Sequence, residues 1–217
     1  MSDLAANLAR VRDRIAAAGR DPSTVRIIAV TKGFGPEVVE AALAAGVDDI
    51  GENYAQEVVA KAAVLARATV HFIGRLQSNK IRVLAPHIAV YQTVDRSTLA
   101  DELARRVTGA RVLVQVNTSE EPQKGGCPPS EARSLVAHCL ERGLRVEGLM
   151  TIGRTGDPAD ARAGFALLSR LADQLGLPER SMGMTDDLEM AVAEGATMVR
   201  VGSALFGARP PKTTRGN

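Results

Sequence analysis

The stretch "RIIAVTKGF", residues 26–34, joins a short apolar run to a polar end. Its apolar residues are mostly β-branched and form a near-continuous series, which is typical of a strand buried on both faces of a sheet. The run ends on Thr31 and Lys32 and meets Gly33 at once. A lysine in this position is usually just the solvated end of a strand. The remainder of the chain must therefore decide whether Lys32 has a chemical role.

Runs of the same kind recur along the chain and alternate with helical patterns. We expect strands near residues 25–31, 48–51, 69–73, 88–93, 111–117, 145–150, 179–182 and 197–201. A helix over residues 3–19 precedes the first strand. Eight strands, each followed by a helix, predict an α/β fold, a single (β/α)8 barrel of the TIM type with an extra N-terminal helix. An open, doubly wound parallel sheet is the alternative.

The helical segments carry their own patterns. In "NYAQEVVAKAAVLA" (53–66) one apolar stripe predicts a helix, and its members are Tyr54, Val58, Ala62 and Leu65. "TDDLEMAVAEG" (185–195) predicts a helix with Thr185 as its N-cap. The helix after the third strand, around 77–84, is expected to be short. No linker divides the chain, so we expect one domain over residues 1–209 and a disordered tail over 210–217.

Composition and charge exclude several classes of protein. The net charge is +2 without a polybasic block, and aromatic residues make up 3% of the chain, so no nucleic-acid or membrane surface is expected. No apolar run approaches the ~18 residues of a membrane span, and the N-terminus lacks the apolar core of a signal peptide. Cys127 and Cys139 have the spacing of neither a zinc site nor a disulfide framework. A cytoplasmic protein without a bound metal is therefore expected.

In a barrel of this type the functional groups lie at the C-terminal ends of the strands and in the loops that follow. Lys32 follows the first strand and Asn53 the second, while Gly183 follows the seventh and Gly202 and Ser203 follow the eighth. Glycine lets a backbone approach an anion closely, and the free N–H groups of a helix N-terminus attract it. The last two turns match the phosphate site that barrels form there. The alternative is a pair of ordinary capped turns.

Arg200 lies within the last strand, in "MVRVG" (198–202). By the alternation of a strand it points either into the mouth of the barrel or toward the helices. A guanidinium keeps its charge, so near the barrel axis it needs an acceptor. Two kinds of acceptor remain open, namely a carboxylate such as Glu52 or Asp186, or an atom of a ligand.

A lysine at the end of strand one, a phosphate cradle and an arginine at the mouth are together the parts of a pyridoxal-phosphate site. Such a lysine forms a Schiff base with the aldehyde of the cofactor, and the barrel holds its phosphate. On these residues alone, pyridoxal phosphate is one candidate among several phosphorylated ligands.

Six stretches between residues 27 and 207 add a resemblance to a known family. They are "IIAVTK", "DIGENYAQE", "HFIGRLQSNK", "VLVQVNTSEE", "GLMTIG" and "SMGMTDDLEMAVAEGATMVRVGSALFG". In content and order they resemble the pyridoxal-phosphate homeostasis proteins, which are similar to the N-terminal domain of alanine racemase. The resemblance covers nearly the whole chain, and "HFIGRLQSNK" and the last stretch are its most specific motifs.

The resemblance implies a fold-type III pyridoxal-phosphate protein that carries its cofactor on Lys32. It implies phosphate contacts from the turn at 181–183 and the turn at 202–203. It also implies that Arg200 faces the pyridine nitrogen and that Asn53 lines the pocket near the lysine. The residues expected to bind the cofactor are Lys32, Asn53, Ser181, Met182, Gly183, Arg200, Gly202 and Ser203.

Some positions depart from the pattern of that family. Thr31 stands where serine is usual, and "GFG" at 33–35 replaces a more polar turn. "PQKGG" at 122–126 replaces a loop of the Ser-Lys-Ser-Gly type but keeps a lysine, Lys124, whose role is left open.

Two functions follow from the resemblance. The first is a monomeric binding protein that holds, buffers and hands on pyridoxal phosphate, with apo forms of enzymes that use this cofactor as partners. An arginine opposite the pyridine nitrogen disfavours its protonation, which makes the ring a weaker electron sink. The second is a small pyridoxal-phosphate-dependent amino-acid racemase. Alanine racemases add a second domain with a tyrosine base, whereas this chain has only Tyr54 and Tyr91. A barrel that binds another phosphorylated metabolite is a third possibility.

Overall fold

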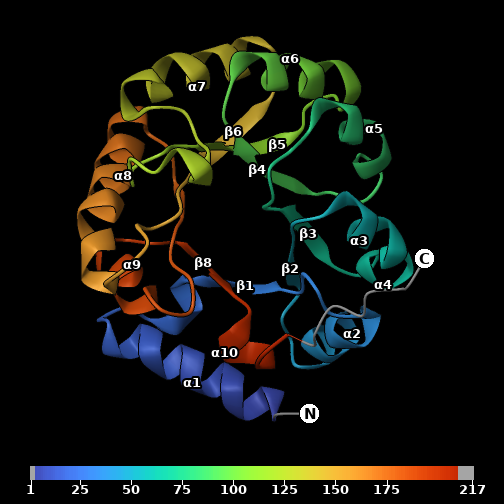
Figure 1. The fold of residues 1–217 in the computed structure, drawn as a ribbon, viewed down its shortest axis with the longest axis vertical. Helices are drawn as coiled ribbons and strands as arrows, with labels where there is room; N and C mark the ends of the chain where they lie inside the picture. Colours follow the sequence, from blue (N-terminus) through green and yellow to red (C-terminus); the bar gives the residue numbers. More distant parts are fainter. Residues whose placement is uncertain (1–2, 210–217) are drawn as a thin grey trace.

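The structure, a computed structural model, describes residues 3–209. Figure 1 shows an inner ring of strands surrounded by an outer ring of helices. All neighbouring strands are parallel and follow the order of the chain, and β8 (Met198–Val201) pairs with β1 (Arg26–Val30). The sheet is therefore a closed barrel. This confirms the (β/α)8 prediction and excludes the open, doubly wound sheet.

The other strands lie close to their predicted positions. They are β2 (Asp49–Glu52), β3 (Thr69–Phe72), β4 (Val90–Val94), β5 (Arg111–Gln115), β6 (Arg145–Met150) and β7 (Glu179–Ser181). The helices that cover them are α2 (Pro36–Ala44), α3 (Ala55–Ala60), α4 (Ala62–Leu65), α5 (Ile81–Leu84), α6 (Ser97–Arg106), α7 (Ala132–Glu141), α8 (Arg162–Leu175), α9 (Leu188–Ala193) and α10 (Ser203–Phe206). Short 3-10 turns are η1 (Pro22–Thr24), η2 (Ser78–Lys80), η3 (Pro122–Lys124), η4 (Pro129–Glu131) and η5 (Pro158–Ala161).

The extra N-terminal helix, α1 (Leu4–Ala17), packs against α9 and α10 (Figure 1). It begins at Asp3, whose carboxylate accepts the N–H of Ala6. From its last turn, Arg14 donates to both carboxylate oxygens of Glu189 and, at 2.8 Å, to the carbonyl of Thr185. Helix α1 thereby fixes the loop that follows β7, which belongs to the mouth of the barrel.

Side chains alternate between two separate cores, as the pleat of a strand requires. The core inside the barrel is small and consists of Ile28, Val90, Leu113, Met150 and Met198. A much larger core fills the layer between strands and helices. Because Ile28 points inward, the side chains two and four positions further along also lie on the inner face, so β1 delivers Lys32 to the barrel mouth.

Three sequence predictions about helices are corrected by the structure. The segment 53–66 is not one helix, since α3 and α4 are separated at Lys61, and Tyr54 is 52% exposed rather than part of a buried stripe. Helix α9 begins at Leu188 with Asp187 as its N-cap, so Thr185 lies in the preceding turn. The Asp187 carboxylate instead accepts the N–H of Met184, which holds that turn outside the helix.

The predicted tail at 210–217 lies outside the described residues. Between residues 3 and 209, no helix is both long enough and apolar enough to span a bilayer.

Candidate functional site

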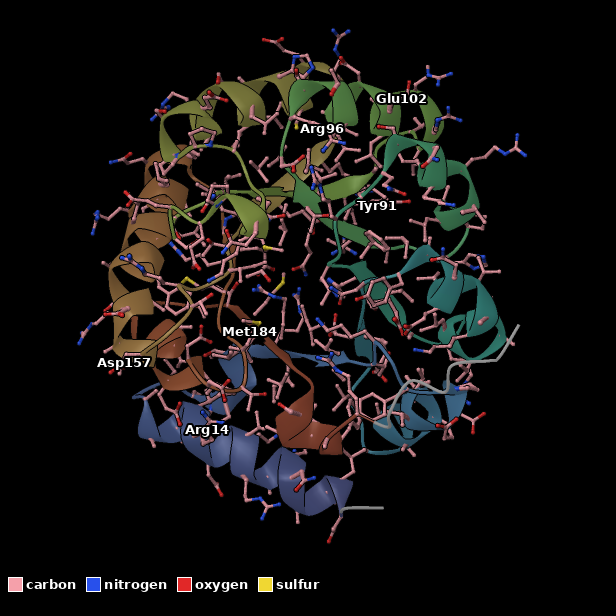
Figure 2. All side chains as sticks on the ribbon, in the orientation of Figure 1. Arg14, Tyr91, Arg96, Glu102, Asp157 and Met184 are labelled. Atoms are coloured by element: carbon pink, nitrogen blue, oxygen red, sulfur yellow. The ribbon has the colours of Figure 1, made fainter. Side chains whose placement is uncertain are left out.

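A cavity of about 250 Å³ opens at the C-terminal ends of the strands. Its apolar wall comes from Val30, Ile73, Met150, Ile152 and Met184, and its polar groups are Lys32, Asn53, Thr185, Asp186, Arg200, Gly202, Ser203 and Arg209. Met184 is labelled in Figure 2 and lies inside the ring of helices at this mouth. Three cations thus share a small, partly apolar cavity, which suits an anionic ligand with a hydrophobic body.

Lys32 enters this cavity from β1. Burial is the main cause that lowers the pKa of its amine below the ordinary value, and the neighbouring charges of Arg209 and Arg200 act in the same direction. Two carboxylates, Glu57 and Glu52, oppose the effect. A lowered pKa increases the fraction of unprotonated amine at neutral pH, and only that form is a nucleophile.

A buried ionic cluster behind the barrel wall holds the backbone on both sides of Lys32. The ammonium of Lys61 donates to Glu52 at 2.7 Å, to Glu57 at 3.1 Å and to the carbonyl of Thr31 at 2.8 Å. The Thr31 hydroxyl donates to Glu52 at 2.6 Å, and the N–H of Gly33 donates to Glu57 at 2.8 Å. Both neighbours of Lys32 are therefore tied to one cluster, which fixes the direction of the lysine.

Arg200 points inward from β8 and is 4% exposed. It donates to the hydroxyl of Ser181 at 2.8 Å and to the carbonyl of Thr151 at 2.7 Å. Neither Glu52 nor Asp186, the two carboxylates considered from the sequence, accepts from it. Burial lowers the pKa of Arg200 to about 10, so the guanidinium stays charged at neutral pH. Two of its five N–H donors are used within the described chain, and the group borders the cavity.

The loops after β7 and β8 meet at the cavity. The hydroxyl of Ser203 lies 3.0 Å from that of Thr185, and Ser203 is the first residue of α10. A side chain at Gly202 would lie 3.2 Å from the carbonyl oxygen of Val30, so the glycine allows β1 and the last turn to approach closely. Two hydroxyls, a short helix start and Arg209 form a set of donors for an anion.

Asn53 borders the cavity from the loop after β2. Its carbonyl oxygen Oδ1 is buried and has no hydrogen-bond partner within the described residues. Buried polar atoms are nearly always paired in folded proteins. The amide is therefore suited to a polar atom of a ligand, with its oxygen or its nitrogen because the two can exchange places by a flip.

The structure brings together five of the eight residues expected at the site. Those that border the cavity are Lys32, Asn53, Arg200, Gly202 and Ser203. The other three, Ser181, Met182 and Gly183, do not border it. Ser181 is fully buried beneath Arg200, and Met182 belongs to the outer core. After Gly183, the residues Met184, Thr185 and Asp186 border the cavity instead. Gly183 nonetheless shapes the turn, since its φ is +89° and a Cβ there would lie 2.5 Å from a side-chain carbon of α9.

Eight lining residues were not among the cofactor contacts expected from the sequence, and they include Met184, Thr185 and Arg209. Thr185 was placed at a helix start, although its hydroxyl faces Ser203. Arg209 follows the last helix in a segment without any periodic pattern. The one signal for Arg209 in the sequence is its place shortly after the glycine turn at 202–203.

Neither tyrosine is among the residues that border this cavity. The hydroxyl of Tyr91 is buried in the outer layer without a hydrogen-bond partner in the described chain, and burial raises its pKa to about 12 (Figure 2). Tyr54 lies in the exposed turn before α3. Lys124 also stays outside the cavity, because it pairs with Glu121 and with the carbonyl of Gly153.

Comparison with known families gives one match over nearly the whole chain. Residues 1–210 match the family described as alanine racemase, N-terminal domain. A protein of Pseudomonas aeruginosa named pyridoxal phosphate homeostasis protein is 45% identical, over 96% of this chain and 97% of its own length. The protein of the same name from Escherichia coli is 38% identical, over 96% of this chain and 98% of its own length.

Solved structures agree with this match. A crystal structure described as an unknown protein from Bifidobacterium adolescentis is 39% identical, with a TM-score of 0.87 over 94% of both chains. PipY of Synechococcus elongatus, solved with pyridoxal phosphate bound, is 34% identical, with a TM-score of 0.77 over 91% of this chain and all of its own. Alanine racemase of Clostridium difficile, at 16% identity and a TM-score of 0.70, shares the fold. The family match over residues 1–210 and these relatives establish that the chain belongs to the alanine racemase N-terminal domain family.

Proposed function

We propose that this protein binds pyridoxal 5'-phosphate in the cavity at the barrel mouth and serves the homeostasis of that cofactor. The observation that carries the proposal is the convergence of Lys32, Arg200 and the pair of hydroxyls at Thr185 and Ser203 on one cavity of about 250 Å³. The cofactor presents an aldehyde, a ring nitrogen and a phosphate, and each finds a group of suitable chemistry there.

Each set of lining groups has a distinct role in this proposal. Lys32 supplies the amine that bonds covalently to the aldehyde, and its lowered pKa favours the reactive form. Ser203, Thr185 and the backbone at Gly202 bind the phosphate, together with the charge of Arg209. The apolar wall packs against the ring.

Arg200 is proposed to face the ring nitrogen. A guanidinium has donors and no acceptor, so it can only donate to that nitrogen and thereby keeps it unprotonated. An unprotonated ring withdraws electrons weakly, which suits a protein that stores the cofactor better than one that labilises bonds of amino acids. When bound, pyridoxal phosphate supplies an electrophilic aldehyde and an electron-accepting ring.

Storage and delivery are favoured over racemisation because neither tyrosine borders the cavity. Racemisation exchanges a proton on both faces of a carbon and therefore needs an acid–base group on each face. Lys32 can serve one face, but no tyrosine borders the cavity among the described residues. PipY has been solved both with and without pyridoxal phosphate. PipY therefore exists with and without its cofactor, which supports reversible loading of the present protein as well.

We further infer that the protein acts as a monomer in the cytoplasm and passes its cofactor to apo forms of enzymes that use pyridoxal phosphate. The test mixes the loaded protein with such an apo-enzyme, across a dialysis membrane and then in direct contact. Activation that is faster on contact supports delivery, and equal rates support simple buffering. Light scattering of the same sample reports the mass in solution.

The racemase alternative is tested on the same preparation. The loaded protein is incubated with L-amino acids and the products are separated by chiral chromatography, beside Lys32→Ala as a control. We expect no sustained formation of D-amino acids. Robust formation that disappears in Lys32→Ala would replace the storage function with the catalytic one.

A further inference from the structure

A continuous chain of hydrogen bonds runs through the interior of the barrel below Arg200. Arg200 donates to the hydroxyl of Ser181 at 2.8 Å, and that hydroxyl lies 2.7 Å from Oε1 of Gln92. The amide nitrogen of Gln92 lies 2.8 Å from Nδ1 of His71, whose Nε2 lies 2.8 Å from the carboxylate of Asp49. Five side chains from five strands thus connect the mouth of the barrel to its opposite end.

With the amide of Gln92 oriented as in the structure, one arrangement of protons satisfies every hydrogen bond of this chain. Arg200 has no acceptor, so the oxygen of Ser181 accepts and its proton goes to Oε1 of Gln92. The amide of Gln92 then donates to Nδ1 of His71, which must carry no proton. His71 is therefore neutral and protonated on Nε2, from which it donates to Asp49. Every bond points in the same direction, from the guanidinium to the carboxylate.

The chain of hydrogen bonds ends at solvent. Asp49 borders a second hollow of about 460 Å³ at the N-terminal ends of the strands, and its side chain is 24% exposed. His71, Gln92 and Ser181 are each fully buried. A barrel interior is normally filled by apolar side chains, as the five residues of the inner core illustrate here. A polar chain in the same space carries a desolvation cost, which packing alone does not explain.

We propose that Gln92, His71 and Asp49 are positioning residues that orient Ser181 and Arg200 toward the ring nitrogen of the cofactor. The proposal rests on the function proposed above. Without Asp49, His71 has no reason to keep its proton on Nε2. If the proton of His71 moves to Nδ1, the amide of Gln92 must turn so that its oxygen accepts that proton. The amide nitrogen of Gln92 and Arg200 then both donate to the oxygen of Ser181. The hydroxyl proton of Ser181 loses its acceptor. The hydroxyl of Ser181 then orients the guanidinium of Arg200 less firmly.

The first test uses the protein without cofactor. The chain contains three histidines, His71, His87 and His138, so ¹⁵N NMR can assign the ring nitrogens of each. We expect His71 to be neutral with its proton on Nε2, and this order to be lost in Asp49→Ala. A proton on Nδ1 of His71 in the wild type, or on both nitrogens, overturns the proposal.

The second test uses the loaded protein with cofactor labelled by ¹⁵N in its ring. Asp49→Ala is compared with Glu179→Ala, which removes a carboxylate of similar exposure at the same end of the barrel. Both carboxylates approach Arg26, at 3.9 Å for Asp49 and 3.3 Å for Glu179, but Glu179 has no contact with His71. Both variants therefore lose a carboxylate beside Arg26, and only Asp49→Ala interrupts the chain of hydrogen bonds. Glu179→Ala in addition removes the acceptor of the Thr197 hydroxyl, at 2.6 Å.

We expect the ring-nitrogen resonance to move in Asp49→Ala toward its value in the free, unprotonated cofactor, and to stay in place in Glu179→Ala. Equal shifts in the two variants, or no shift in either, overturn the proposal. A wild-type protein that fails to bind the cofactor would contradict the proposed function instead. The protonated ring nitrogen of His71, measured without cofactor, still decides whether the hydrogen bonds run in the direction described.

Discussion

Replacing Lys61 by methionine removes the buried ammonium at the centre of the cluster that supports Lys32. The side chain of Lys61 is 3% exposed and that of its partner Glu52 is 0% exposed. Removing one partner of a buried ion pair costs about 3–5 kcal/mol, because it leaves a buried charge without compensation. We expect the free energy of unfolding to fall by that amount and Tm to fall by roughly 6–20 °C.

The measurement is urea denaturation followed by circular dichroism, with two comparison variants. Arg162→Met breaks a surface pair with Glu194 in which the arginine is 63% exposed, and it should cost about 0–1 kcal/mol. The double variant Lys61→Met with Glu52→Gln removes both charges and should recover much of the loss. A cost for Lys61→Met no larger than that for Arg162→Met would refute the reasoning.

The pH dependence gives an independent check of the same cluster. Burial raises the pKa of Glu52 above its ordinary value of 4.5, while hydrogen bonds from Lys61 and Thr31 lower it. Removing Lys61 therefore raises the pKa further. A carboxyl group whose pKa is higher in the folded state loses stability as pH rises from the ordinary value through the raised one. The deficit of Lys61→Met relative to the wild type should shrink at acid pH, and a constant deficit would contradict this account.

Other predictions follow from single contacts. Ser203→Ala should weaken retention of pyridoxal phosphate about ten- to a hundred-fold, because a hydrogen bond to a charged phosphate is worth about 1.5–3 kcal/mol; equal affinity by fluorescence titration would place the phosphate elsewhere. Gly183→Ala should lower Tm more than Gly143→Ala, since both have positive φ but a Cβ at Gly183 meets α9 at 2.5 Å and one at Gly143 meets nothing within 4 Å. Burial raises the pKa of both Cys127 and Cys139 to about 12. The folded protein should therefore react slowly with a thiol reagent at pH 8, with two thiols released by denaturant, and a fast thiol in the native state would show that one of them is accessible.

Features that depend on neighbours along the chain could be predicted from the sequence. The alternation of apolar runs with helical patterns predicted the barrel, because the apolar composition of each run indicates that its strand is buried. The position of Lys32 at the end of the first strand could be predicted in the same way, whereas its inward direction follows from the inward side chain of Ile28 in the structure. The glycine turn before α10 could be predicted because glycine and serine directly precede an apolar run.

Features that depend on distant partners could not be predicted. The acceptors of Arg200 are Ser181 of β7 and the backbone carbonyl of Thr151, the residue after β6, and a backbone carbonyl carries no signature in the sequence. Lys61 lies outside the apolar stripe predicted for residues 53–66, and its burial against Glu52 depends on the break between α3 and α4. The polar chain through the barrel depends on the register of three neighbouring strand pairs, and the sequence does not specify that register.

The most direct test of the central claim is to find where the cofactor is attached. The loaded protein is reduced with borohydride and digested with trypsin, and the peptides are identified by mass spectrometry. Modification of Lys32 blocks cleavage there, so the adduct should appear on the peptide 27–61, which contains no other internal lysine or arginine. An adduct on Lys61, Lys80 or Lys124, or no covalent adduct at stoichiometric cofactor, would contradict the account.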